Sequence, residues 1–266
     1  MFLDKAALYE LERAEAENHR LFVEACRELY PNEVVSVEEN DSGLMAFTGV
    51  DSPLSQSMAL GFKGPVDAHC VKKIEAFYRQ FDCPANIEVA NVADASLTEQ
   101  LVAHDFKVTE YSHVLVQELR EAFTSPVIDG VVVRCMEKGE EETVARVLSE
   151  GFIGAPDSPH LPLFNGFVRQ KNASVHVAVI QETIVAAAGL FMHGNIALIG
   201  VATTLPAYRG RGLQKALITA RLNWAIAQGC NRAMVVTEPA TISQKNVQKM
   251  GFSIAYARAK FTKETN

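Results

Sequence analysis

Apolar residues in the second half of the chain follow two different periods. Short apolar runs bounded by turn residues predict strands at 131–136, 174–180, 183–193, 195–204, 232–237 and 253–261. Apolar residues at helical spacing predict helices at 140–152 and 213–228, and a short helix after the strand that ends at 237. The proline-bearing stretch 153–165 is predicted to be irregular. This order of elements is typical of an α/β (α+β) domain.

The first half begins with an amphipathic pattern and ends in a segment rich in turn residues. Apolar residues recur near helical spacing among acids and bases and predict an N-terminal helix. These apolar residues are Leu8, Leu11, Leu21, Phe22 and Ala25. Ser, Pro, Asp and Gly gather at 123–130 between two apolar stretches. We therefore divide the chain into two predicted domains, residues 1–125 and 126–266.

The two predicted domains share a pattern. Residues 87–119 align with residues 233–264 as strand, turn, short helix and final strand, with "HDFKV" opposite "MGFSI". We interpret this as an internal repeat, in which a helix near 67–81 corresponds to the helix at 213–228. The alternative is a helical cap domain whose similarity to the second half arises by chance.

Composition narrows the class of protein. The chain has 266 residues, of which 48% are hydrophobic and 21% charged, as in soluble globular proteins. A net charge of −7 and a pI near 5.6 disfavour nucleic acid as a partner. The five cysteines are scattered without a C-x-x-C pair, which predicts reduced thiols in the cytoplasm and no metal site. Neither a signal peptide nor a membrane span is indicated.

Residues 209–212 place two arginines and two glycines directly before the helix predicted at 213–228. The first N–H groups of a helix have no internal partner and lie at the positive end of its dipole, so they stabilise an anion. Gly210 and Gly212 let the backbone approach a ligand, and Arg209 and Arg211 can add charge-assisted contacts. The segment therefore predicts a binding site for a phosphate or diphosphate.

Two familiar nucleotide-binding loops do not match this segment. The dinucleotide fingerprint requires a third small residue at the position of Lys215. A P-loop requires Gly-Lys followed by Ser or Thr, where this chain has Gly212, Leu213 and Gln214.

The segment "VATTLPAYRGRGLQKAL" resembles the acetyl-CoA signature of the GCN5-related N-acetyltransferases (GNAT), written Q/R-x-x-G-x-G/A. Here the signature begins at Arg209, and Gln214 replaces its last small residue. A second landmark of the family, an Asn ahead of a Gly-Phe pair, is present as Asn246, Gly251 and Phe252. The resemblance covers residues 131–261. It implies two GNAT-like domains, each a mixed, mostly antiparallel sheet flanked by helices, the first of them degenerate and without a cofactor loop.

The resemblance also implies acetyl-CoA as a cosubstrate. In the family, the strand before the loop diverges from its neighbour, and the pantetheine arm pairs with the exposed strand backbone. The residues implied in cofactor binding are Ala202, Thr203, Thr204, Arg209, Gly210, Arg211, Gly212, Leu213, Gln214 and Asn246.

Catalytic groups have weaker signals. Transfer to an amine needs a base, and the leaving thiolate needs a proton. The family often uses a Tyr four residues before the Gly of the Gly-Phe pair, where this chain has Val247. We take Glu238 as a candidate base and Tyr256 as a candidate acid, although Glu238 is equally compatible with a solvated turn. Asp157 and His160 lie in the region that corresponds to the acceptor site.

The predicted function is acetyl transfer from acetyl-CoA to a small-molecule or peptide amine, directly within a ternary complex. A non-catalytic acyl-CoA binder or sensor is the main alternative, motivated by Val247 and by the first half of the chain. A structural interaction protein without a cofactor comes third. We expect no nucleic-acid or membrane partner, and either a monomer or a homodimer.

Overall fold

The computed structural model describes residues 3–40 and 43–264. The first half contains α1 (Lys5–Leu29), β1 (Ser36–Asn40), β2 (Gly43–Phe47), β3 (Ser57–Met58), α2 (Ala68–Arg79), β4 (Ala85–Ala90), α3 (Ala95–Ala103) and β5 (Lys107–Glu118). The second half contains β6 (Val131–Cys135), α4 (Glu141–Ile153), α5 (Leu161–Arg169), β7 (Ala173–Ile180), β8 (Thr183–His193), β9 (Ile196–Thr204), α6 (Leu213–Ala227), β10 (Arg232–Thr237), α7 (Ile242–Lys249) and β11 (Ser253–Lys263).

The elements predicted for the second half are confirmed, except that α5 begins inside the segment expected to be irregular. Pro162 lies in the first turn of α5, where proline fits because the N–H groups there have no helical partner. Gly166 faces α1, and a Cβ at this position would come within 2.7 Å of the Cys26 Sγ. Pro162 therefore lies at the start of this helix, and Gly166 allows its close packing on α1. Neither residue interrupts the helix.

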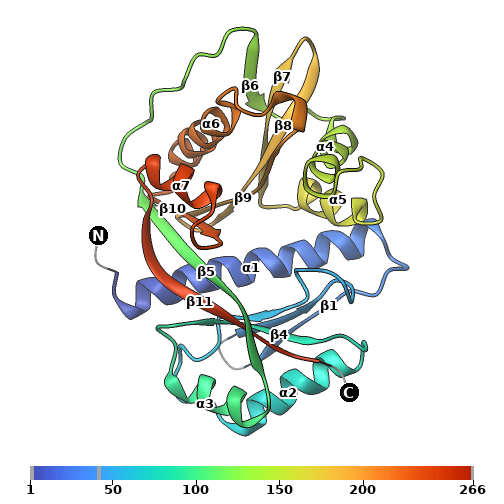
Figure 1. The fold of residues 1–266 in the computed structure, drawn as a ribbon, viewed down its shortest axis with the longest axis vertical. Helices are drawn as coiled ribbons and strands as arrows, with labels where there is room; N and C mark the ends of the chain where they lie inside the picture. The colour runs from blue at the N-terminus through green and yellow to red at the C-terminus, as the bar shows by residue number, and fades with distance from the viewer. Residues whose placement is uncertain (1–2, 41–42, 265–266) are drawn as a thin grey trace.

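All strands in the described residues join one sheet, in the order β1-β2-β3-β4-β11-β5-β10-β9-β8-β7-β6. The last strand of the first half, β5, lies between β10 and β11 and is antiparallel to both. The last strand of the second half, β11, lies between β5 and β4. The two halves thus exchange their final strands at the centre of the sheet (Figure 1).

The internal repeat is confirmed by the order of elements. The unit β4-α3-β5 corresponds to β10-α7-β11, and the helix expected near 67–81 is α2. Because the first half contributes its own strands to the shared sheet, it is not a helical cap. Residues 119–130 contain neither helix nor strand. The division into residues 1–125 and 126–266 falls in this connection and stays a prediction.

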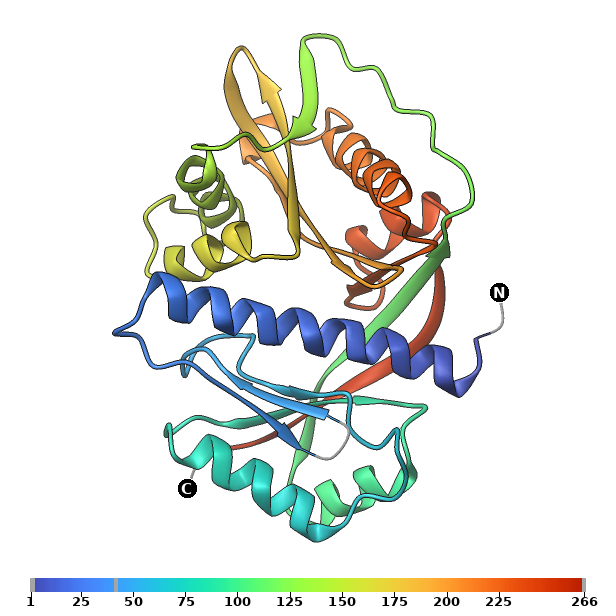
Figure 2. The same ribbon diagram turned by 180° about the vertical axis from the view of Figure 1, so that it is seen from behind.

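Helices cover both faces of the sheet. In the second half, α6 and α7 pack on one face, and α4 and α5 pack on the other, as the alternation along β8 shows: Ala186 and Ala188 contact α6, whereas Ala187 contacts the α4 side. Helix α1 crosses the middle of the molecule between the two halves (Figure 2). It contributes Leu11 to a core with β10 and β11 and Val23 to a core with β2.

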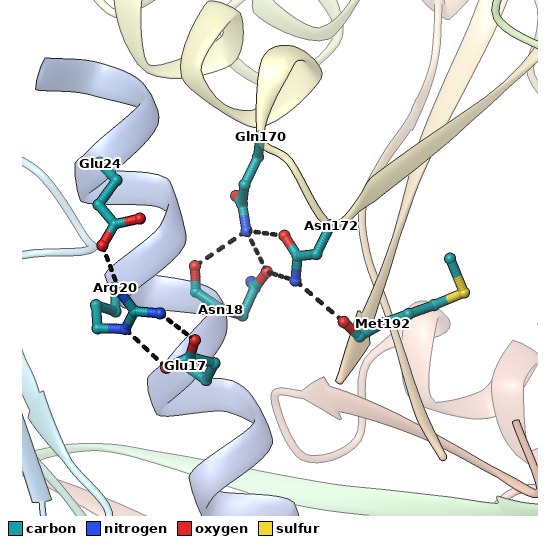
Figure 3. Close-up of polar contacts among 7 residues, drawn as sticks. All are labelled: Glu17, Asn18, Arg20, Glu24, Gln170, Asn172 and Met192. Carbon is teal, nitrogen blue, oxygen red and sulfur yellow. Dashed lines mark hydrogen bonds and ion pairs between the residues drawn. The ribbon is translucent and has the colours of Figure 1, made fainter. Parts of the chain in front are cut away.

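Amide side chains connect α1 to the second half (Figure 3). Gln170, which follows α5, donates its Nε2 to the backbone oxygen of Asn18 at 3.0 Å and to its Oδ1 at 2.5 Å. The Nδ2 of Asn172 lies 3.4 Å from the same Oδ1 and 3.4 Å from the backbone oxygen of Met192. Asn18 and Gln170 are buried, so these bonds fix α1 against the end of α5.

A buried ion-pair cluster joins α1 to β11. Arg258 is 2% exposed, and its Nη2 lies 2.7 Å from Glu12 and 2.6 Å from Glu15. Tyr256 donates its hydroxyl to Glu12. Burial raises the pKa of Glu12 above its usual value in spite of Arg258. Burial also acts to raise the pKa of Glu15, but there the attraction of Arg258 prevails and the pKa is lowered.

Candidate functional site

Strands β9 and β10 diverge within the sheet. In the described residues their parallel pairing ends at Leu198 and Met234, although both strands continue. Beyond this point, the edge of β9 that faces β10 leaves backbone groups without a ladder partner. Val201 has a φ of 44°, uncommon for a β-branched residue, at a register shift between β8 and β9. The gap therefore begins beside a strained bulge.

The connection from β9 to α6 turns at two glycines. Gly210 has a φ of 78° and Gly212 a φ of 82°, in the left-handed region that favours glycine. Helix α6 begins at Leu213, and no side chain of the described residues caps its N-terminus. The first N–H groups of α6 are therefore open to a ligand.

A cavity of about 740 Å³ lies against this helix start, between β9, α6 and α7. The structure gathers all the residues predicted to bind the cofactor around this cavity except Arg211. Those that line it are Ala202, Thr203, Thr204, Arg209, Gly210, Gly212, Leu213, Gln214 and Asn246.

The two arginines of the loop have different surroundings. The Nε of Arg209 donates to the backbone oxygen of Thr204 at 3.0 Å, and its Nη2 lies 3.5 Å from the backbone oxygen of Gly151. Arg211 lies over the ring of Tyr208, 5.2 Å from its centroid. Arg209 therefore braces the loop against β9 and α4, while Arg211 lies outside the cavity wall.

Residues of α6 and α7 meet at the cavity and add positive charge to it. The Nδ2 of Asn246 donates to the Oε1 of Gln214 at 2.8 Å, so two predicted cofactor contacts bond to one another. Lys215 and Lys249 also line the cavity, as does Ile242, which is 77% exposed. Sequence reasoning missed these three, although Lys249 lies one helical turn after Asn246 on the same face.

Arg221 was also missed. It lies two turns into α6, lines the cavity and is 2% exposed. Its neighbours at the buried positions of α6 are mostly apolar, including Leu217, Ile218 and Leu222. The signal that could have identified it is a lone charge within an otherwise apolar helical stripe.

The predicted catalytic residues do not gather at the cavity. Glu238 follows β10 and is exposed, outside the cavity wall. Tyr256 points to the opposite face, where it packs in the core beneath α1. Val247 is buried against α6 and β10, and its hydrocarbon side chain has no proton to give to a thiolate. Asp157 forms an exposed ion pair with Arg146 at 3.1 Å.

His160, the remaining residue of the expected acceptor region, directly precedes α5 without capping it through its side chain. The described residues contain no group of three or more His, Cys, Asp or Glu side chains that could hold a metal ion. The five cysteines lie within the described residues, and none of them forms a disulfide there. Across the described part of the chain, no helix combines the length and apolar character needed to cross a membrane.

The corresponding helix of the first half, α2, starts differently. Asp67 caps it, accepting a hydrogen bond from the N–H of Cys70 at 3.0 Å. A carboxylate at this position occupies one of the free amides and repels an anion. The first half therefore lacks the open helix start that α6 presents.

Comparisons with known proteins agree with this geometry. The family model described as Acetyltransferase (GNAT) family matches residues 142–252, which include β9, the glycine loop and α6. No curated protein matches the chain.

Three solved structures are similar over most of the chain. A GCN5-related N-acetyltransferase from Kribbella flavida has a TM-score of 0.67 at 14% identity, covering 94% of this chain and 96% of that one. Another from Sphaerobacter thermophilus has a TM-score of 0.62 at 14% identity, covering 86% and 76%. A tandem GNAT protein from the clavulanic acid biosynthesis pathway has a TM-score of 0.59 at 12% identity, covering 93% and 95%. Residues 142–252 therefore form a domain of the acetyltransferase (GNAT) family, within a chain whose GNAT fold includes a GNAT-like N-terminal half.

Proposed function

We propose that this chain binds acetyl-CoA in the cavity at the start of α6 and transfers its acetyl group to an amine. The observation that supports this most is the uncapped N-terminus of α6, which opens into a large cavity beside the gap between β9 and β10. The diphosphate of the coenzyme would accept hydrogen bonds from the first amides of α6. Each charge at such a helix end contributes about 0.3–1 kcal/mol when exposed and more when partly buried.

The rest of the coenzyme extends along β9. Its pantetheine arm would pair with the unpaired backbone edge at Ala202, Thr203 and Thr204, all of which line the cavity. The bulge at Val201 turns the strand at this point, so a backbone N–H there could polarise the thioester carbonyl. Lys215 and Lys249 supply further positive charge for the phosphates.

The reaction joins the amine nitrogen to the acetyl carbon and breaks the carbon–sulfur bond within a ternary complex. The amine must lose a proton, and the departing thiolate must gain one. Glu238 is our candidate for the proton acceptor, acting through water because its carboxylate lies outside the cavity wall. We do not assign the second proton to Tyr256, because its hydroxyl already donates to Glu12 on the other face. Nothing in the described cavity wall requires a covalent acyl-enzyme.

The acceptor is a small-molecule or peptide amine, and we place the reaction in the cytoplasm, with a monomer or a homodimer as the active form. The net charge of −7 favours a cationic amine over a nucleic acid or an acidic membrane surface.

Release of free CoA thiol from acetyl-CoA, measured across a panel of amines, tests the activity. An acetyltransferase will release thiol at a rate that depends on the amine, above slow background hydrolysis. A non-catalytic sensor, which the buried Val247 and the exposed Glu238 still favour, would bind CoA without amine-dependent release. Binding of CoA with no release for any amine would contradict the transfer and support the sensor.

Replacing Gly212 tests the position of the diphosphate. We expect Gly212→Asp to weaken CoA binding about tenfold relative to Gly212→Asn, a difference of ~1.4 kcal/mol, because it places a negative charge at the positive end of α6. Asn and Asp tolerate the left-handed backbone of this residue similarly, so Gly212→Asn is the matched control. Isothermal titration of both variants with CoA gives the two dissociation constants. Equal dissociation constants for the two variants would mean that the diphosphate does not bind at the start of α6.

A further inference from the structure

Arg221 is a buried cation at the inner part of the cavity. The rise of an α-helix puts its Cα about 12 Å along the axis from that of Leu213 at the helix start. Gln214, Leu217, Ile218 and Arg221 share one face of α6, at spacings of three and four residues, and all line the cavity. The cavity therefore has positive groups at two places, the start of α6 and Arg221.

Arg221 is held by backbone oxygens rather than by an acid. Its Nη1 donates to Gly189 at 2.9 Å and lies 3.4 Å from the oxygen of Gly200, while its Nε donates to Leu217 at 3.1 Å. Among the described residues, its Nη2 forms no hydrogen bond and no carboxylate pairs with it. Both Gly189 and Gly200 adjoin the bulge at Val201, so the guanidinium lies next to the proposed thioester position.

An unpaired buried charge is unusual because burial removes the water that stabilises it. The same burial lowers the pKa of Arg221 to about 9. Backbone oxygens supply partial negative charge but no compensating anion. A ligand that brings a carboxylate to Nη2 would pair this charge.

We propose that Arg221 forms a subsite for a carboxylate at the end of the acyl group, so that the site prefers acyl-CoA thioesters derived from dicarboxylic acids over uncharged acyl-CoA thioesters. This inference rests on the proposed binding of CoA along α6 and β9. With the diphosphate at the helix start, the acyl group extends past Val201, where Nη2 is the available donor. Arg221 is then a specificity-determining residue.

A purely structural role gives a different expectation. If Arg221 only holds β8 and β9 together through Gly189 and Gly200, its removal would loosen the bulge and weaken every acyl-CoA alike. The ratio of two dissociation constants separates the roles, because a general loosening cancels in the ratio.

Butyryl-CoA and succinyl-CoA provide the matched pair, since their acyl chains have the same number of carbons and differ by a terminal carboxylate. We expect isothermal titration of the full chain, without an amine, to give a dissociation constant about tenfold lower for succinyl-CoA. The preference should disappear in Arg221→Met and persist in part in Arg221→Lys. In Lys249→Met, both ligands should weaken together and the ratio should stay, because Lys249 is on α7 and not beside the bulge.

The outcomes distinguish the two proposals. If the wild-type chain binds CoA but binds butyryl-CoA as tightly as succinyl-CoA, the carboxylate subsite is wrong while the cofactor site stands. A preference that survives in Arg221→Met also overturns the subsite. If Arg221→Met does not fold, the ratio of the dissociation constants for butyryl-CoA and succinyl-CoA is compared between wild type and Arg221→Lys. A ratio near one in wild type, or an equal ratio in both proteins, overturns the subsite. If neither CoA nor any thioester binds the wild-type chain, the proposed function itself fails.

Discussion

Residues 1–125 and 126–266, each expressed alone, will fail to fold into a stable monomer. Without β5, the strand β10 loses its antiparallel partner from Arg232 to Thr237, and β11 loses both of its neighbours. Val114 and Leu115 of β5 are fully buried in cores on opposite faces of the sheet, so both cores open. The exposed strand edges then favour aggregation. We expect each fragment to be insoluble, or to lack a cooperative unfolding transition by circular dichroism.

A cut chain is the matched control for this experiment. Co-expression of the two fragments, or cleavage of the intact protein between Ser125 and Pro126, breaks the chain but leaves every strand available. The cut lies in an exposed connection without helix or strand. We expect the paired fragments to copurify and to unfold in one cooperative transition. The first fragment supplies β5 as the partner of β10, and the second supplies β11 as the partner of β4. A fragment 126–266 that folds alone would mean that the second half does not need β5.

The individual helices and strands were predictable because the spacing of apolar residues within each segment indicates its type. The exchange of β5 and β11 between the two halves was not predictable. Each of these strands has the same sequence pattern whichever half it pairs with. Their places follow from pairings between residues far apart in the chain, such as Lys260 with Glu110 and Ala259 with Val89. A repeat in the sequence specifies two similar units but not how their last strands are shared.

That most of the predicted cofactor residues line one cavity could be anticipated for a related reason. A glycine loop before a helix is a continuous segment, so its residues stay together in any fold that keeps the helix. Tyr256 lies on the face opposite the cavity for a local structural reason. A register shift in β11 lets Ile254 pair with Leu115 and Tyr256 pair with Val114, on opposite faces of the sheet. Strict alternation would have put both residues on one face, and the sequence carries no clear mark of this bulge.

Arg258→Met will be the most destabilising single substitution among those considered, lowering the free energy of unfolding by about 3–5 kcal/mol. Removing this guanidinium leaves Glu12 and Glu15 buried without their counter-charge. Urea unfolding measures the loss. Lys171→Met is the control, because it breaks the exposed ion pair between Lys171 and Glu28 of α1 and should change stability little. Equal losses in the two variants would contradict the role of the buried cluster.

The pH dependence of Arg258→Met identifies the cause of the loss. Burial already raises the pKa of Glu12, and without Arg258 the pKa values of Glu12 and Glu15 should both rise above those of the unfolded chain. The folded variant then binds more protons than the unfolded one, so its stability falls as pH rises above the ordinary carboxyl pKa, about 4.3 for glutamate. We expect the variant to be closer to wild type at pH 5 than at pH 8. Adding Glu12→Gln and Glu15→Gln should restore much of the stability at pH 8, because amides carry no charge to bury. A loss that is independent of pH and unrelieved by the two glutamines would instead indicate that the packing of the Arg258 side chain, rather than its charge, joins α1 to β11.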